Sequence, residues 1–163
     1  MVARTRAAEA EPGPEDVVRL VGVFHDVVRA SFHRLRPILE AYGITLGQFL
    51  TLHIVSTLGV ASVGSVARRQ GVSAPAVCVS IDQLERAGLV RRQRSRRDAR
   101  SVELSTTPRG HRVEARVWSE ARRQMTDIVR GLPEADLATA MNVLEQIARR
   151  LEPEYDAHPL ERP

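Results

Sequence analysis

Eleven consecutive residues, Arg91 to Ser101, hold the densest group of side chains that could bind another molecule. They read RRQRSRRDARS and contain six arginines and one aspartate, a net charge of +5. Because the whole chain has a formal net charge of +4, the remainder carries a net charge of −1. Guanidinium groups bind phosphate oxygens through paired N–H donors. A basic patch confined to one stretch favours a polyanion partner over a merely solvated loop.

Other reactive side chains are few. Cys78 is the only cysteine, so the chain can form no disulfide within itself and no thiolate metal cluster, and a reducing cytoplasm is the expected compartment. Cys78 is interpreted as a small, half-buried side chain, with a redox switch as the alternative. The histidines show no metal-ligand spacing beyond His111 and Glu114, so we expect no metal and no cofactor.

Catalytic motifs are missing from the sequence. It contains no phosphate-binding loop, no G-x-S-x-G elbow and no H-E-x-x-H helix, so we expect no enzymatic activity. A binder of single-stranded nucleic acid is an alternative, but such proteins stack bases on aromatic rings. No Phe, Tyr or Trp lies between Phe49 and Trp118, which favours a duplex partner. A module that only binds other proteins is a further alternative.

The basic stretch lies in a predicted hairpin. LVRRQR (89–94) and SVELST (101–106) are short alternating segments on either side of a polar turn, a pattern typical of two paired strands. Two short helices precede them, with Ser73 as the N-cap of the second helix and Gly88 at its end. A helix-turn-helix followed at once by a basic hairpin is the order of a winged helix.

Longer amphipathic helices flank this region. Apolar residues at three- and four-residue spacing predict a helix from Asp16, which Pro37 should kink or end early. Thr45 and Gln48 can form a capping box at the start of the next helix. After the hairpin, a helix opens at Thr107 and Pro108.

The sequence GLP (131–133) separates that helix from a last one, which ends near Leu151. The first and last helices offer more apolar surface than one small winged domain can bury, so we expect a homodimer.

Residues 41–67 contain no charged side chain, but glycines and hydroxyl side chains interrupt this apolar segment. They are interpreted as buried core, with no membrane partner.

The expected fold is mainly α, and α+β only through the wing. It consists of a winged helix-turn-helix DNA-binding lobe and an all-helical dimerisation region made by the N- and C-terminal helices. The predicted divisions are a disordered tail (1–14), a single domain (15–151) with its winged part at about 45–107 and its dimerisation helices at about 15–40 and 108–151, and a flexible tail (152–163).

Residues 84–110, LERAGLVRRQRSRRDARSVELSTTPRG, match a known pattern: a leucine, a Gly-Leu-Val helix end, an Asp-x-Arg wing and a Leu-Thr-x-x-Gly exit. With ITLGQFLTL and SVARRQGVSAPAV, they resemble the multiple antibiotic resistance regulator (MarR) family of bacterial transcription factors, over about residues 16–151. The resemblance implies a cytoplasmic homodimer that binds a pseudo-palindromic operator in double-stranded DNA. It further implies repression that is released by a small aromatic or phenolic ligand.

The resemblance also assigns DNA-contacting residues. Asp98 and Arg100 take the places of the family's wing aspartate and arginine, where the aspartate orients an arginine that enters the minor groove. Ser73 and Pro75 match the start of its recognition helix. Together with the charge pattern, this gives the expected DNA-binding set: Arg68, Arg69, Ser73, Ala74, Pro75, Ala76, Val79, Arg94, Arg96, Arg97, Asp98 and Arg100.

The predicted recognition helix departs from the family pattern. Ala74, Ala76, Cys78 and Val79 stand where threonine, arginine or glutamine is usual. Few side chains there can form hydrogen bonds with base edges. Either base recognition depends on Ser73 and on apolar contact with thymine methyl groups, or sequence specificity is poor.

A pocket for a small ligand is implied between the helical and winged regions. His25, Phe49, His53 and Trp118 are the candidates to line it, and each is explained equally well as a core residue.

Overall fold

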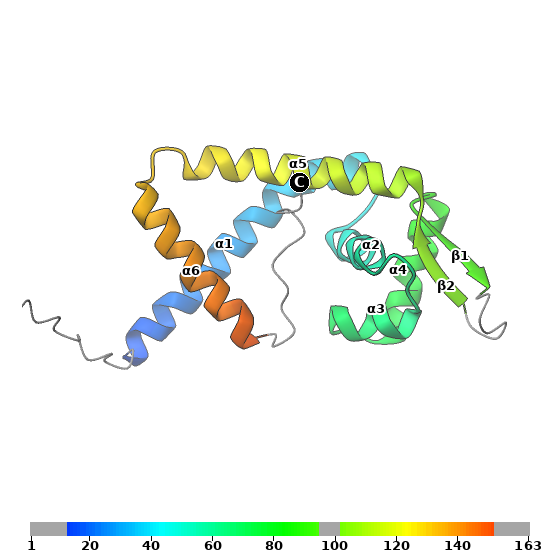
Figure 1. Ribbon diagram of the computed structural model, residues 1–163, viewed down its shortest axis with the longest axis horizontal. Helices are drawn as coiled ribbons and strands as arrows, with labels where there is room; N and C mark the ends of the chain where they lie inside the picture. The colour runs from blue at the N-terminus through cyan, green and yellow to red at the C-terminus, as the bar shows by residue number, and fades with distance from the viewer. Residues whose placement is uncertain (1–12, 95–101, 152–163) are drawn as a thin grey trace, which may run out of the picture. The chain divides into compact units, whose positions relative to one another are not determined.

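The computed structural model describes residues 13–94 and 102–151, which form six helices and one antiparallel hairpin (Figure 1). The elements are α1 (Pro14–Ala41), α2 (Leu46–Leu58), α3 (Val63–Gln70), α4 (Ala74–Arg86), β1 (Val90–Arg94), β2 (Val102–Thr106), α5 (Pro108–Val129) and α6 (Glu134–Leu151). The mainly helical fold with a hairpin is therefore confirmed. The chain divides into two compact units, residues 1–120 and 121–163, and α5 contributes to both.

Local hydrogen bonds set the helix ends that the sequence predicts. Gln48 N donates to Thr45 Oγ1 at 3.3 Å and Thr45 N donates to Gln48 Oε1 at 2.8 Å, which is the predicted capping box of α2. Ser73 Oγ accepts from Ala76 N at 3.4 Å and so caps α4. Gly88, just beyond α4, has φ +69°, which reverses the chain into β1.

Of the two effects predicted for Pro37, a kink or an early end of the first helix, the early end is wrong. Helix α1 begins at Pro14, two residues before the expected start, and continues past Pro37 to Ala41. A proline inside a helix removes one hydrogen bond and crowds the preceding turn. Leu35 and Leu39, on either side of it, pack on the core, and Leu39 is buried. Their burial holds the last turns of α1 in place.

One hydrophobic core lies within the first unit, where α2, α3 and α4 pack on one another and on the hairpin (Figure 1). Its fully buried large side chains include Phe49, Leu52, Val55, Val66, Val77, Ile81, Leu84, Leu89, Val90, Leu104 and Val117. Much of this core comes from the uncharged segment 41–67, as predicted.

Among the described residues no single helix is long and apolar enough to span a membrane. Only α1 and α2 together reach that length and composition, with a bend of 81° between them.

The hairpin is anchored at its base. Its strands pair from Val90 with Thr106 to Arg94 with Val102. On the other side of β2, Ala61 N donates to Leu104 O at 3.0 Å and Leu104 N donates to Ala61 O at 2.7 Å. Because Leu104 and Val90 are buried, the strands join the core rather than extend freely from it.

Arg92 ties β1 to α4. Its guanidinium lies 2.6 Å from Asp82 Oδ1 and 2.9 Å from Glu85 Oε2, and its backbone N–H donates to Glu85 Oε1 at 3.3 Å. Burial disfavours the charged guanidinium, but hydrogen bonding to Asp82 and the charges of Asp82 and Glu85 raise the pKa of Arg92 above its ordinary value. One side chain thus fixes the hairpin against the helix.

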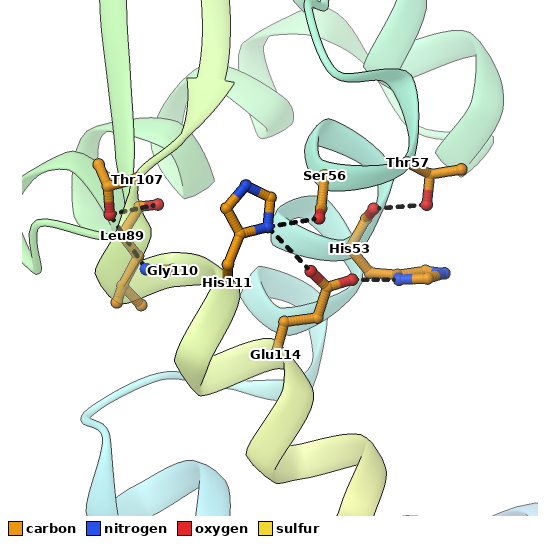
Figure 2. Close-up of polar contacts among 8 residues, drawn as sticks. All are labelled: His53, Ser56, Thr57, Leu89, Thr107, Gly110, His111 and Glu114. Atoms are coloured by element: carbon orange, nitrogen blue, oxygen red, sulfur yellow. Dashed lines mark hydrogen bonds and ion pairs between the residues drawn. The ribbon is translucent and has the colours of Figure 1, made fainter. Parts of the chain in front are cut away.

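The start of α5 is bound to the turn between α4 and β1 (Figure 2). Thr107 Oγ1 donates to Gly88 O at 2.7 Å and accepts from Gly110 N at 3.0 Å, while Thr107 N donates to Leu89 O at 3.0 Å. Gly110 passes so close to this turn that a Cβ would overlap Leu89 O and lie 2.7 Å from Thr106 Cγ2. Thr107 and Gly110 of the exit motif therefore allow the start of α5 to pack closely against the turn between α4 and β1.

We predict that Gly110→Ala lowers the free energy of unfolding by about 1–3 kcal/mol, because the added methyl meets a backbone oxygen that cannot rotate away. Urea titration followed by circular dichroism measures this loss. The matched control is Gly64→Ala in α3, where the nearest atom, Ser62 Oγ, is 3.9 Å from the added Cβ and alanine favours the helix. Equal destabilisation of the two variants would contradict this account of the α5 junction.

Candidate nucleic-acid interface

Helix α4 has one buried face and one open face. Val77, Ile81 and Leu84 are buried in the core, as their spacing predicts. The open face begins at the N-terminal end of the helix, where the cap Ser73 and the helical residues Ala74, Pro75, Ala76 and Val79 are all exposed. The structure therefore brings the predicted recognition-helix residues together on one accessible surface.

The predicted basic contacts lie on other elements. Arg68 and Arg69 are exposed in the last turn of α3, the helix before α4. Arg94 is exposed at the end of β1, next to the segment that links the two strands. The other four predicted wing residues lie outside the described residues: Arg96, Arg97, Asp98 and Arg100.

Sequence reasoning missed how the polar side chains of α4 are used. Gln83 Oε1 accepts a hydrogen bond from Gln48 Nε2 of α2. Asp82 and Glu85 hold Arg92, as described above. No local sequence signal pairs these residues, because the pairings depend on how α2 and β1 pack on α4. Their effect is to commit three polar side chains of the helix to contacts within the protein.

Three of the four predicted ligand-pocket residues meet in the first unit. Phe49 is buried, with its ring centre 5.7 Å from that of Trp118, and the His53 ring centre lies 5.3 Å from Trp118. His25 lies apart from them on α1: its side chain is 72% exposed and its nearest ionic partner is Asp26, at 3.6 Å. The three rings in contact form a joint between α2 and α5.

A polar network lies beside these rings (Figure 2). His53 Nδ1 is 2.7 Å from Glu114 Oε1, and both side chains are largely buried. His111 Nδ1 is 3.2 Å from Ser56 Oγ and 4.0 Å from Glu114 Oε2. Within the part of the chain that the structure describes, no three His, Cys, Asp or Glu side chains are arranged to hold a metal ion. The network joins α2 to α5.

A cavity of about 510 Å³ lies between the C-terminal half of α1 and the start of α2. Phe32, Leu39 and Ile44 contribute apolar walls. Arg29, His33 and Arg36, which also line it, are spaced four and three residues apart on one side of α1. That spacing was the available sequence signal for this site. Glu40, Thr45 and Leu46 complete the lining. Because its two arginines outnumber the one carboxylate, the lining suits a small molecule with an apolar body and an acidic group.

Helices α1 and α6 leave apolar side chains open. In α1 the exposed set is Val17, Val18, Leu20, Val21, Val23, Phe24, Val27 and Phe32. In α6 no residue is buried, and Met141, Val143, Leu144 and Leu151 are exposed. Contiguous apolar surface of this kind marks an interaction site.

Known proteins resemble this chain over most of its length. Residues 42–101 match the model of the MarR family. The HTH-type transcriptional repressor MdtR of Bacillus subtilis (strain 168) is 26% identical over 129 residues, which cover 77% of this chain and 83% of the relative.

Solved structures share the fold. A MarR family protein from Bacillus stearothermophilus superposes with a TM-score of 0.78 at 21% identity, covering 86% of this chain and 98% of the other. A mutant MarR from E. coli, in complex with operator DNA, has a TM-score of 0.66 at 20% identity, covering 80% and 94%. Residues 42–101 thus resemble the MarR family, and the chain shares the winged helix-turn-helix fold of solved MarR family structures.

Proposed function

We propose that this protein is a MarR family transcriptional regulator, a homodimer that binds a pseudo-palindromic operator in double-stranded DNA and represses transcription until a small ligand releases it. The observation that carries the proposal is the open N-terminal face of α4 beside a basic hairpin that Arg92 fixes to the same helix. The MdtR repressor and the E. coli MarR complex with operator DNA support it by analogy. A DNA partner also favours a cytoplasmic location.

The two parts of this surface have separate tasks. A recognition helix enters the major groove with its N-terminal residues toward the bases, which here are Ser73, Ala74, Pro75, Ala76 and Val79. The arginines of α3 and the wing bind phosphates and fix the register of the protein on the duplex. If a dimer neutralises about six phosphates, log K falls with log salt at a slope of about −5.

The wing tip adds a contact of its own. Asp98 is the one acidic residue of the basic stretch, and a patch selected for charge alone would gain nothing from it. We propose that it orients Arg100 toward the minor groove, where a guanidinium is attracted by the negative potential of narrow A·T tracts. Arg94, Arg96 and Arg97 then contact the neighbouring backbone.

We propose that dimerisation buries the exposed apolar side chains of α1 and α6. In this division of the chain, residues of about 45–107 bind DNA, while about 15–40 and 108–151 form the dimer. The apolar surfaces of two copies would meet across a twofold axis, which places two recognition helices about 34 Å apart, one helical turn of DNA. A dimer with twofold symmetry would thus bind an operator with matching twofold symmetry.

Ligand release is proposed to act through the cavity between α1 and α2. A small aromatic or phenolic acid would place its ring against Phe32 and its acidic group near Arg29 and Arg36. Because α1 belongs to the proposed dimer region and α2 to the DNA-binding lobe, a ligand that fits one arrangement of the two better than the other shifts their populations. The Phe49, His53 and Trp118 joint transmits the change along α5.

The experiment that tests the function is selection of bound duplexes from random double-stranded DNA by the full-length protein. We predict an enriched palindromic consensus with half-sites about one helical turn apart, because two identical helices read the two halves. Recovery of duplexes without any shared sequence would refute sequence-specific regulation and would favour a weakly specific DNA-binding or interaction protein. Recovery of single strands in a parallel arm would favour the single-strand alternative.

The dimer has its own test. We predict that Leu144→Asp, at an open apolar position of α6, weakens self-association by about 100-fold or more, because a carboxylate without a partner is costly to bury in an interface. Sedimentation velocity measures the loss. Asn142→Asp adds the same charge at an exposed polar position of α6 and should leave the dimer intact. A stable dimer in both variants would show that α6 does not hold the copies together.

A further inference from the structure

The N-terminal part of the open face of α4 would present mainly hydrocarbon to a major groove, and the exposed polar residues Gln83 and Arg86 follow toward the other end of the helix. Pro75 and Val79 are four residues apart, so they adjoin on the side of the helix opposite the buried residues. Ala76 lies three residues before Val79 and flanks the same surface. All three are exposed, and Val79 is 59% exposed. Their side chains carry neither a hydrogen-bond donor nor an acceptor.

The polar neighbours of this surface have partners inside the protein. Gln83 Oε1 accepts from Gln48 Nε2, and the Asp82 and Glu85 carboxylates hold Arg92. Ser73 Oγ accepts from Ala76 N, which leaves its hydroxyl hydrogen as a donor. The folded helix therefore uses several of its polar side chains within the protein, and the hydrocarbon surface is confined to its N-terminal turns.

Base pairs differ in what they offer to such a surface. In the major groove, thymine presents a C5-methyl group, which is the one apolar feature there, while the other groups are donors and acceptors. A donor or acceptor covered by hydrocarbon loses its water without gaining a partner, which is costly. A methyl group loses nothing and gains apolar contact.

We infer that this protein selects its DNA by C5-methyl groups, with Val79 and Ala76 as the specificity-determining residues and Ser73 as the polar contributor at the start of the helix. The inference rests on the proposed DNA-binding function and concerns how the bases are read. It assigns the preference to the methyl group itself and not to the identity of the base. 5-Methylcytosine, which carries the same methyl group in the groove, should then replace thymine.

The test uses the selected duplex in four versions that differ at the contacted thymine of each half-site. These carry T·A, U·A, 5-methylcytosine·G or C·G, and affinity is measured by fluorescence anisotropy with the full-length protein. We expect the two methylated versions to bind alike. Removal of the methyl group should weaken binding about fourfold per half-site and about 15-fold for the dimer.

A protein variant locates the contact. Val79→Ala should bring the affinity ratio of the T·A and U·A duplexes close to one, because the groups that touch the methyl are removed. Val60→Ala is the matched control: Val60 is 57% exposed and lies between α2 and α3, so its loss should leave the ratio unchanged.

The possible outcomes distinguish a failure of methyl readout from a failure of the proposed DNA-binding function. Equal binding of the T·A and U·A duplexes, or an unchanged ratio in a Val79→Ala protein that still binds, overturns methyl readout and leaves sequence-specific binding standing. Binding of C·G as tightly as 5-methylcytosine·G overturns it as well. If selection yields no consensus, the proposed function fails and methyl readout fails with it.

Discussion

A single guanidinium joins the two elements on which the proposed DNA recognition depends. Arg92 leaves β1 and contacts two carboxylates of α4, so the hairpin cannot turn relative to the helix without separating three charges. The other end of the same region is fixed by Thr107 and Gly110, which bind the α4–β1 turn to the start of α5. These contacts join α4, the hairpin strands and the start of α5 to one another. Arg92 belongs to the basic stretch, yet its ion pairs lie within the protein.

A division of tasks would explain how a helix with an apolar N-terminal surface can serve the proposed function. Under the proposed function, phosphate contacts from the arginines of α3 and the wing would supply affinity that does not depend on sequence. Apolar contacts of α4 would then need only to discriminate between DNA sequences, and each contacted methyl group adds a modest binding free energy. Discrimination accumulates because a dimer would read two half-sites with a fixed separation.

Much of this fold could be predicted from the sequence because its signals are local. Thr45 with Gln48, Ser73 and Gly88 act within one turn of chain, and the spacing of Val77, Ile81 and Leu84 reports a buried face directly. Pro37 was misjudged because burial of Leu39, a tertiary effect, outweighs a local penalty. The Arg92 bridge and the Gln48–Gln83 hydrogen bond could not be foreseen, since each depends on the packing of separate elements.

In the candidate sites, too, features set by local sequence could be predicted, and features that depend on the packing of separate elements could not. The open face of α4 was predictable from helix periodicity, and the aromatic joint between α2 and α5 partly so. The cavity beside Arg29, His33 and Arg36 needed the path of α1 over the start of α2. His25 was chosen for its chemistry alone, and the structure places it on an open face of α1.

The measurement that tests the central claim most directly is the affinity of the double variant Asp82→Asn, Glu85→Gln for the selected duplex. Removal of two negative charges from a DNA-binding surface should tighten binding if electrostatics alone matters. If the Arg92 bridge holds helix and wing in one reading position, binding to the selected duplex should instead weaken by about tenfold, or about 1.4 kcal/mol. Tighter binding by the folded variant would contradict the account.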